Sequence, residues 1–375
     1  MQTGRSMLRE VEVYQMFRIE LLPALHGDCI LIQYGSDAAP RRILIDGGPI
    51  GAYEALTARV NKLPIKWRRF GLLVITHIDA DHIEGVVRLL AERTKDFYFD
   101  DVWFNGWRHL DDSRGILGAV SGEFLSALIK KTVGTERWNK AEPFKKGTIK
   151  AGDEHLPTVS LEDGMQLTVL SPTDEKLSML RKTWEKDVKK KGFDPGDLDA
   201  ALALLSQTKR LVPKGLLGAS YQEAGERFKI DSSVANASSI ALLAEFEGKR
   251  CLFLADAHPD VVTASLRKLL ASGDQKFRVD AVKLSHHGSS ANTTPELLDL
   301  IDCKRFLVST NGDVFGHPDA SAIDMILRRA GPGVTLLFNY ASNTTQAWAD
   351  TARQREECFT SLYPEVEGGS LIVDL

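Results

Sequence analysis

The sequence predicts an α/β protein of the α+β sandwich type, in which two mixed β-sheets pack face to face between two outer layers of helices. Two observations lead to this four-layer αββα arrangement. Each half of the chain opens with strand-like segments separated by turns, and strands alternating with amphipathic helices follow them. Each half can therefore form a sheet that helices cover on its outer face.

The first half supplies the first sheet and its helices. β-branched and aliphatic runs predict strands, and apolar residues at helical spacing predict helices. The expected strands are Val13–Leu22, Cys29–Tyr34, Arg41–Ile45, Leu72–Ile75 and Phe97–Phe104, and the expected helices are Tyr53–Leu63 and Ile83–Glu92. The turn Asp46-Gly47-Gly48-Pro49 ends the third strand.

The middle of the chain has no clean periodicity. Residues 105–230 contain polar helical pieces and clusters of Gly and Lys, and we expect much of this stretch to be an insertion on the surface of a single domain spanning 1–375. Within it, Met165–Leu170 is expected to be a strand that returns to the main domain, and Glu175–Lys191 a charged helix. That basic helix is either a solvated face or a contact for a nucleic-acid backbone.

The second half supplies the second sheet. A Glu247-Gly248-Lys249 turn between two apolar runs predicts a β-hairpin. Strands are expected at Ile240–Phe246, Arg250–Leu254, Ala281–Leu284, Arg305–Val308, Val334–Asn339 and Ser370–Val373, with helices at Val261–Ala271, Pro295–Ile301 and Ala320–Arg329.

Composition sets limits on location and partners. The chain has 375 residues, of which 43% are hydrophobic, and a net charge of -4, so it is not built as a whole to capture nucleic acid by charge. Its first residues lack the apolar stretch of a signal peptide, and no segment reaches the roughly 18 apolar residues that span a bilayer. We therefore expect a soluble, cytoplasmic protein without membrane insertion. No pair of its four cysteines has metal-binding CxxC spacing.

Metal-ligand residues crowd one short loop. His77, Asp79, Asp81 and His82 follow the predicted strand Leu72–Ile75 and precede a helix. Open sheets place ligand sites at the carboxyl ends of strands, and neighbouring carboxylates repel each other unless a cation separates them. The loop is therefore expected to bind metal, although Asp79 or Asp81 could instead cap the helix.

This run resembles the His-x-His-x-Asp-His signature of the metallo-β-lactamase superfamily, with Asp79 where a second histidine usually stands. That difference resembles the branch that contains the metallo-β-lactamase-like domain of the bacterial competence protein ComEC. Further segments follow the family order: Gly27-Asp28, Ile45-Asp46-Gly47-Gly48, Asn236-Ala237-Ser238-Ser239, the strand that ends at Asp256, Lys283–Ser289 with its His-His-Gly-Ser element, and Gly316-His317-Pro318. The resemblance implies the four-layer metallo-β-lactamase fold and a metal-dependent hydrolase.

The resemblance also implies roles for these residues. His77 and Asp79 would bind a first metal, Asp81 and His82 a second, and Asp256 would bridge the two. His286, at the strand end, would complete the second site. Asp81 would also orient the attacking water, and His317 would contact substrate or metal. Asp28, Asp46, His287 and Ser289 would orient the ligands or contact the substrate.

One ligand of the family pattern is missing. The superfamily usually has a further histidine in the middle of the chain, and the candidates here, His109 and His155, lie in the insertion without a clean strand before them. The number of ions, one or two, is therefore left open. Zn²⁺ or Mn²⁺ suits imidazole and carboxylate ligands, and Asp79 in place of histidine favours Mn²⁺.

Some of these residues have an ordinary structural alternative. His317 can be a surface turn residue, and Ser289 can cap the helix that starts near Pro295. Lys283 alternates with apolar Val282 and Leu284 and is expected to face solvent.

Three functions remain open from the sequence. The first is a phosphodiesterase, most specifically a nuclease, with nucleic acid as its partner. The second is hydrolysis of a lactone, a thioester or another small molecule. The third is a metal-stabilised binding or sensor subunit without turnover, which would bind a protein partner through the insertion.

Overall fold

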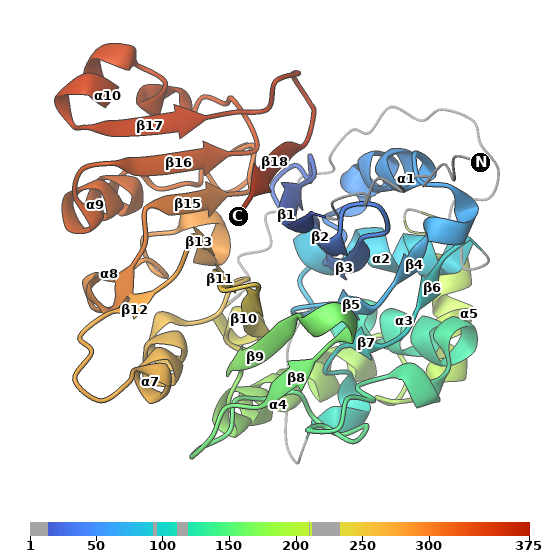
Figure 1. Cartoon of the computed structure of the whole chain (residues 1–375). Helices are drawn as coiled ribbons and strands as arrows, with labels where there is room; N and C mark the ends of the chain where they lie inside the picture. The colour runs from blue at the N-terminus through green and yellow to red at the C-terminus, as the bar shows by residue number, and fades with distance from the viewer. Residues whose placement is uncertain (1–13, 93–95, 111–118, 210, 212–232) are drawn as a thin grey trace, which may run out of the picture.

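Two β-sheets face each other across the middle of the molecule, and helices cover the outer face of each (Figure 1). The computed structural model describes residues 14–92, 96–110, 119–209, 211 and 233–375. Val13 and parts of the predicted insertion, within 111–118 and 212–232, lie outside these residues. The predicted four-layer αββα sandwich is confirmed.

The first sheet has six strands in the order β18-β1-β2-β3-β5-β7. Their bounds are β1 Gln15–Leu21, β2 Ile30–Ser36, β3 Arg41–Ile45, β5 Leu72–Val74, β7 Val102–Trp103 and β18 Leu371–Asp374. β3, β5 and β7 run parallel, so their carboxyl ends meet at one edge of the sheet.

The second sheet has eight strands in the order β17-β16-β15-β13-β11-β10-β9-β8. Their bounds are β8 Thr158–Ser160, β9 Gln166–Ser171, β10 Ala241–Phe246, β11 Lys249–Phe253, β13 Ala281–Lys283, β15 Arg305–Val308, β16 Val334–Phe338 and β17 Phe359–Leu362. β10 and β11 form the expected hairpin. From β11 to β17 the strands are parallel, which brings their carboxyl ends to one edge as well.

Three hydrophobic cores hold the layers together. The cluster between the sheets contains Ile32 and Ile43 of the first sheet and Leu167 and Leu242 of the second. A second cluster joins the first sheet to α1 (Tyr53–Asn61), α2 (Ala80–Glu92) and α3 (Ala119–Leu128). A third joins the second sheet to α7 (Pro259–Leu269), α8 (Pro295–Leu300) and α9 (Ala320–Ala330). Consecutive residues of a strand therefore face different cores, as Ile43 and Leu44 do.

The helices follow the predicted order. Those described are α1 Tyr53–Asn61, α2 Ala80–Glu92, α3 Ala119–Leu128, α4 Asp174–Lys190, α5 Leu198–Gln207, α6 Ser233–Ala237, α7 Pro259–Leu269, α8 Pro295–Leu300, α9 Ala320–Ala330 and α10 Thr351–Glu356. None of the helices in the described part of the chain has the length and apolar character that crossing a bilayer requires.

The structure differs from the sequence predictions at several places. The predicted strand Ser370–Val373 forms β18, which pairs with β1 in the first sheet and not with strands of the second sheet. The segment predicted as one strand at Phe97–Phe104 forms two, β6 Tyr98–Phe99 and β7, because β6 pairs with β4 (Arg69–Phe70) in a separate small sheet. Near the carboxyl terminus, α10 and β17 were not predicted, since their residues Thr351–Leu362 are largely polar or charged.

The described part of residues 105–230 packs tightly onto the main fold. Phe124 and Leu128 of α3 and Trp184 of α4 are buried in the same core as α2. β9 coincides with the predicted strand Met165–Leu170 and pairs with β10, and β8 extends the same sheet. The boundaries of the insertion stay a prediction.

Candidate metal centre

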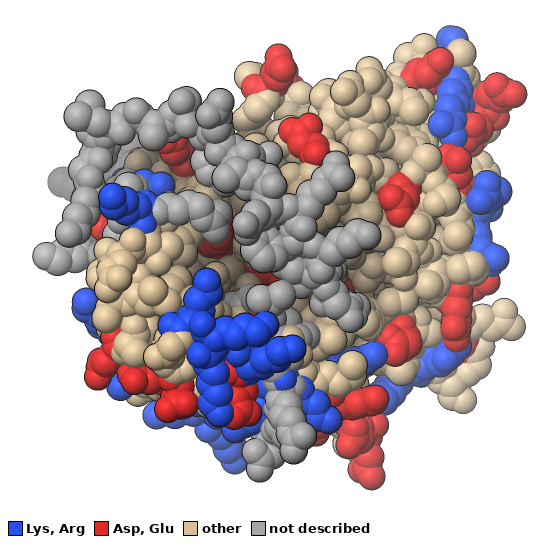
Figure 2. All heavy atoms as spheres, turned by 180° about the vertical axis from the view of Figure 1, so that it is seen from behind, with Lys and Arg blue, Asp and Glu red and all other residues tan. Residues whose placement is uncertain are grey.

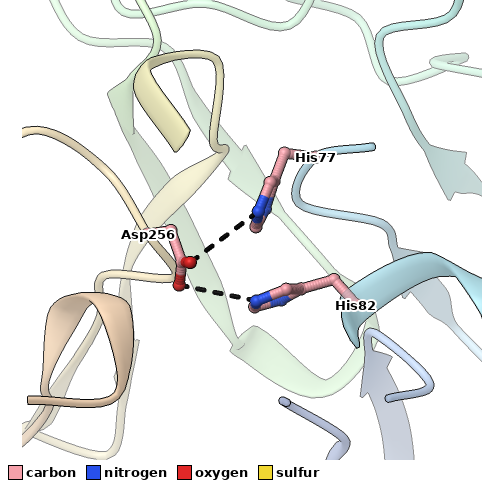
Figure 3. Close-up of side chains that lie close together, drawn as sticks. All are labelled: His77, His82 and Asp256. Carbon is pink, nitrogen blue, oxygen red and sulfur yellow. Dashed lines mark ion pairs between the residues drawn. The ribbon is translucent and has the colours of Figure 1, made fainter. Parts of the chain in front are cut away.

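The polar cluster lies where the carboxyl ends of both sheets meet. In the first sheet, Asp46 follows β3, His77 follows β5, and Asp81 and His82 lie in the first turn of α2. In the second sheet, Asp256 follows β11, and the pair His286-His287 follows β13. Asp256 therefore faces His77 and His82 across the two halves of the sandwich (Figure 3).

The two oxygens of the Asp256 carboxylate face different imidazoles. Oδ1 lies 3.5 Å from Nε2 of His82 and 3.9 Å from Nε2 of His287. Oδ2 lies 3.8 Å from Nε2 of His77 and 3.8 Å from Nε2 of His286. The carboxylate thus lies between two pairs of imidazoles, each of which points Nε2 toward it.

The remaining two carboxylates divide between these pairs. Asp79 Oδ2 lies 3.6 Å from Nε2 of His77. Asp81 Oδ2 lies 3.5 Å from Nε2 of His287 and 3.9 Å from Nε2 of His82. Among the described residues, two groups of buried side chains have ligand atoms close enough to hold a metal ion, namely His77, His82 and Asp256, and Asp81, His82 and His287.

The ligand atoms of this cluster fit a cation. Nε2 of His77, His82 and His287 and Oδ1 of Asp256 are all buried, and none has a hydrogen-bond partner among the described residues. Buried polar atoms without partners are costly, and imidazole and carboxylate atoms that face one another are good ligands for Zn²⁺ or Mn²⁺. A divalent ion between them would satisfy these atoms.

Hydrogen bonds at Nδ1 turn the histidines of the first sheet toward the centre. Nδ1 of His82 lies 2.8 Å from Oδ2 of Asp46. Thr76 donates its hydroxyl to the same oxygen at 2.7 Å, and this hydroxyl lies 3.0 Å from Nδ1 of His77. With Nδ1 donating in both rings, Nε2 is left as the ligand atom, an arrangement common around protein-bound metals.

The histidines of the second sheet are held in the same way. Nδ1 of His287 donates to the carbonyl of Ser309 at 2.8 Å. Nδ1 of His286 lies 3.1 Å from Oδ1 of Asn292, whose amide group donates to the carbonyls of Asp256 and Ala257 and so fixes its orientation. Four imidazoles from two sheets therefore present Nε2 to one carboxylate.

The electrostatics of the cluster reflect its burial and its charges. Burial by itself raises the pKa of Asp81, but the neighbouring His82 and His287 lower it to about 2. Burial lowers the pKa of His287, but Asp256 and Asp28 raise it to about 9. The carboxylates that raise the pKa of His287 also favour a cation at this centre.

The backbone at the cluster is unusual. His286 has φ of 46°, His287 55°, Ala255 47° and Asp46 57°, all in the left-handed region that non-glycine residues rarely adopt. Such conformations cost about 1–3 kcal/mol each and gather at functional sites. Here the conformations of His286 and His287 direct the rings of two consecutive residues toward the same side chain. Nε2 of His286 faces Oδ2 of Asp256, and Nε2 of His287 faces Oδ1.

Asp28 lies behind the centre and contacts a lysine that was expected to face solvent. Lys283 is wholly buried, and its Nζ lies 2.6 Å from Oδ2 of Asp28. The expectation from alternation is wrong, because β13 is an interior strand with both faces covered. The other oxygen of Asp28 lies 3.6 Å from Nδ1 of His287.

His317 and Ser289 border the centre. The ring of His317 lies 5.1 Å from that of His286, edge to face, and its Nδ1 lies 3.1 Å from Asp319 Oδ1. Ser289 is buried, and its hydroxyl accepts a hydrogen bond from the backbone of Ala291. Thr294, rather than Ser289, caps α8.

The geometry differs from the sequence expectation at the His-His pair. His287, predicted as a supporting residue, lies in the group with Asp81 and His82, whereas His286 lies on the side of His77. His109 does not join the cluster, and its ring packs against Trp138 instead. The supporting residues Thr76, Asn292 and Ser309 were not predicted, because nothing in the sequence links them to distant histidines.

Comparison with known proteins gives matches among solved structures alone: no family model and no curated protein matches the chain. The metallo-β-lactamase fold protein YhfI from Bacillus subtilis is 10% identical, with a TM-score of 0.42 over 96% of this chain and 100% of its own. CmlA, a diiron β-hydroxylase from Streptomyces venezuelae, is 13% identical, with a TM-score of 0.40 over 97% of this chain and 54% of its own. The chain thus spans about half of the CmlA chain.

The assignment of the fold rests on the chain itself. Two mixed sheets pack between helices, and a cluster of histidines and carboxylates lies where the parallel strands of both sheets end. The chain has the metallo-β-lactamase fold.

Proposed function

We propose that this protein is a metal-dependent hydrolase that cleaves phosphodiester bonds, as a nuclease of the ComEC-like branch. The observation that carries the proposal is the carboxylate of Asp256, which has two imidazole Nε2 atoms at each of its oxygens. A bridging carboxylate of this kind suits two neighbouring cations, the arrangement used by many phosphatases and nucleases.

The proposal assigns two sets of ligands, which the distances to Asp256 support. His77, Asp79, His286 and Oδ2 of Asp256 would hold one ion. His82, Asp81, His287 and Oδ1 of Asp256 would hold the other. In this assignment His286 takes the place of the mid-chain histidine that the sequence lacks.

The bound ions would supply an acidified water for attack and positive charge for the phosphoryl oxygens. The protein's own residues do the rest. Asp46, Thr76, Ser309 and Asn292 hold the ligand imidazoles in one orientation. Asp81 would orient a water through its carboxylate, and His317, whose ring lies beside that of His286, would contact a substrate phosphate.

Aromatic side chains at the border of the centre favour a nucleic acid. Phe315 is 52% exposed, its ring stacks on that of His317 with centroids 6.2 Å apart, and it lies 5.8 Å from the ring of His26. Bases of single-stranded nucleic acids stack on exposed aromatic rings. On the face seen in Figure 2, a group of Lys and Arg side chains lies at the lower left beside Asp and Glu side chains, and basic side chains of this kind can contact a phosphate backbone.

Cleavage assays test this proposal. The protein is incubated with single- and double-stranded DNA and RNA in the presence of Mn²⁺, and His77→Ala/Asp81→Ala serves as the inactive variant. His155→Ala, at an exposed histidine, serves as the matched control. We expect cleavage by the wild type and the control but not by the double variant. Equal cleavage by all three, or none by the wild type, would contradict the proposal.

Metal analysis tests the ion. Three carboxylates lie among the ligands, and carboxylate oxygen suits Mn²⁺, so we expect protein purified without added metal to take up Mn²⁺ and to be active with it. Stoichiometric Zn²⁺ in the purified protein, with activity in Zn²⁺ alone, would contradict the expected preference for Mn²⁺. His287→Ala is expected to reduce the metal content from two ions to one.

A further inference from the structure

A cavity with a volume of about 980 Å³ lies at the opposite end of the first-sheet strands from the candidate metal centre. Its lining includes Arg41 and Arg42 at the start of β3, Gly71 before β5 and Asp101 before β7, together with β8. The metal-centre residues follow the other ends of the same strands. Arg42 and Asp46, four residues apart along an extended strand, are separated by about 13 Å.

Arg42 in the wall of this cavity is a buried cation without an acidic partner. It is 5% exposed, and its Nη1 donates to the carbonyls of Pro40 and Trp67, both at 3.1 Å. Its Nε is buried and has no hydrogen-bond partner, and among the described residues no ion pair involves Arg42. An unpaired buried guanidinium is costly, and burial together with Arg59 lowers its pKa.

The acidic residues of the lining already form ion pairs or hydrogen bonds with neighbouring groups. Asp100 pairs with Arg69, Glu142 with Lys145, and Glu162 with Arg41. Asp101 accepts hydrogen bonds from the backbone amides of Val102, Lys140 and Ala141 and from the indole of Trp103. Among the described residues, Lys66 and Lys140 form no ion pair.

Positive charge therefore remains in excess. Six basic side chains line the cavity, Arg41, Arg42, Lys66, Arg69, Lys140 and Lys145, against four acidic ones, Asp100, Asp101, Glu142 and Glu162. An anion entering the cavity would meet Arg42, Lys66 and Lys140 without having to displace a carboxylate.

Apolar side chains make up much of the remaining wall, namely Tyr34, Pro40, Trp67, Pro143, Val159 and Leu161. Ligand pockets of this size usually combine apolar walls with a few polar groups that fix orientation. A guanidinium recognises planar carboxylates and phosphates through paired donors. The wall thus suits a molecule that has an anionic group on an apolar body.

We propose that this cavity is a binding site for a small organic anion, an aromatic or aliphatic molecule carrying a carboxylate or a phosphate, with Arg42 as its main charged contact. The site is separate from the metal centre and does not depend on the function proposed for it.

Binding of naphthalene probes tests the site. 1-Naphthoate, 1-naphthyl phosphate and the neutral 1-naphthylmethanol are titrated into the full chain by calorimetry, with metal removed by a chelator. We expect at least one anion to bind and to bind more tightly than the neutral probe. Whichever anion binds more tightly identifies the headgroup.

Variants locate the binding. Arg42→Met is expected to weaken the binding of the anionic probe by about tenfold or more, since a charge-assisted hydrogen bond is lost. Ala141→Trp fills the cavity from a loop without removing Arg42 and is expected to abolish it. Arg68→Met, nearby but outside the lining, and His77→Ala, in the metal centre, should leave it unchanged. Circular dichroism checks the folding of each variant.

The outcomes decide between the cavity and other sites. No binding of either anion, equal binding of the neutral probe, or binding that survives Ala141→Trp would overturn the proposal. Loss of binding in His77→Ala would place the probe in the metal centre instead, which also overturns it.

Discussion

Oδ2 of Asp46 lies 2.8 Å from Nδ1 of His82, although the two residues are 36 positions apart in the chain. The same carboxylate accepts hydrogen bonds from the amide and the hydroxyl of Thr76, the residue before His77. One carboxylate after β3 therefore orients two imidazoles that belong to the next strand and helix. The orientation of these two candidate metal ligands depends on a residue that is not itself a candidate ligand.

Asp46→Ala is expected to weaken metal binding by about 10- to 100-fold, the usual effect of removing such a supporting residue. Without the carboxylate, the imidazole of His82 loses its fixed orientation. Calorimetric titration with Mn²⁺ and with Zn²⁺ measures the change, and Asp153→Ala, at an exposed aspartate, is the control. Unchanged affinity in a folded Asp46→Ala variant would show that packing alone orients the ring.

Lys283→Met is expected to lower the free energy of unfolding by about 3–5 kcal/mol at neutral pH, because it leaves the buried Asp28 without its cation. Lys249→Met, which removes an exposed lysine 3.6 Å from Asp280, should change it by less than about 0.5 kcal/mol. Urea unfolding measures both.

The pH dependence of the same variant gives a second check. Burial by itself raises the pKa of Asp28, but Lys283 and His287 hold it below its usual value, so the carboxylate is charged in the wild type. In Lys283→Met this pKa rises, and protonation then relieves the buried charge. The difference in the free energy of unfolding between the wild type and Lys283→Met should therefore shrink as the pH falls. A difference that is constant with pH would argue against a charge effect.

His109 is expected to make the fold sensitive to mild acid. Burial, with help from Arg108, lowers its pKa from 6.5 to about 3. The unfolded chain then binds a proton below pH 6.5 while the folded chain does not, so stability is lost as the pH falls from 6.5 toward 3, by about 1.4 kcal/mol per pH unit from this group.

His109→Phe keeps a ring beside Trp138 and removes the proton-binding group. The difference in unfolding free energy between this variant and the wild type should grow in favour of the variant below about pH 6.5. Chemical unfolding at a series of pH values measures it. Parallel curves for the two proteins would mean that His109 does not titrate in this range.

Gly27→Ala is expected to disturb the metal centre from outside it. A Cβ at Gly27 would lie 1.8 Å from the backbone oxygen of Asp81, so the loop or the first turn of α2 must move. We expect a loss of about 1–3 kcal/mol in stability and weaker metal binding. Gly71→Ala, whose Cβ would have its nearest neighbour at 3.8 Å, is the control. Metal affinity equal to that of the wild type would refute the link.

Much of the fold is readable from local pattern. The strands β15 and β16 and the helices α7 and α9 fall within one or two residues of their predicted ranges, because each has a continuous apolar face or run bounded by turns. The local pattern does not predict the two strands within residues 97–104, because two short strands that pair with different sheets look like one strand in the sequence. Pairing partners are a tertiary property.

The sequence by itself determined the order of layers and the cluster His77, Asp79, Asp81 and His82, because strand and helix periods and the spacing of ligand residues are local. The tertiary structure alone decided the rest. It turned His286 and His287 to opposite oxygens of Asp256, buried Lys283 against Asp28, and opened a basic cavity at the far end of the strands. The physical reason is that the direction and burial of a side chain depend on which distant strands pack together. The sequence around each residue does not determine that packing.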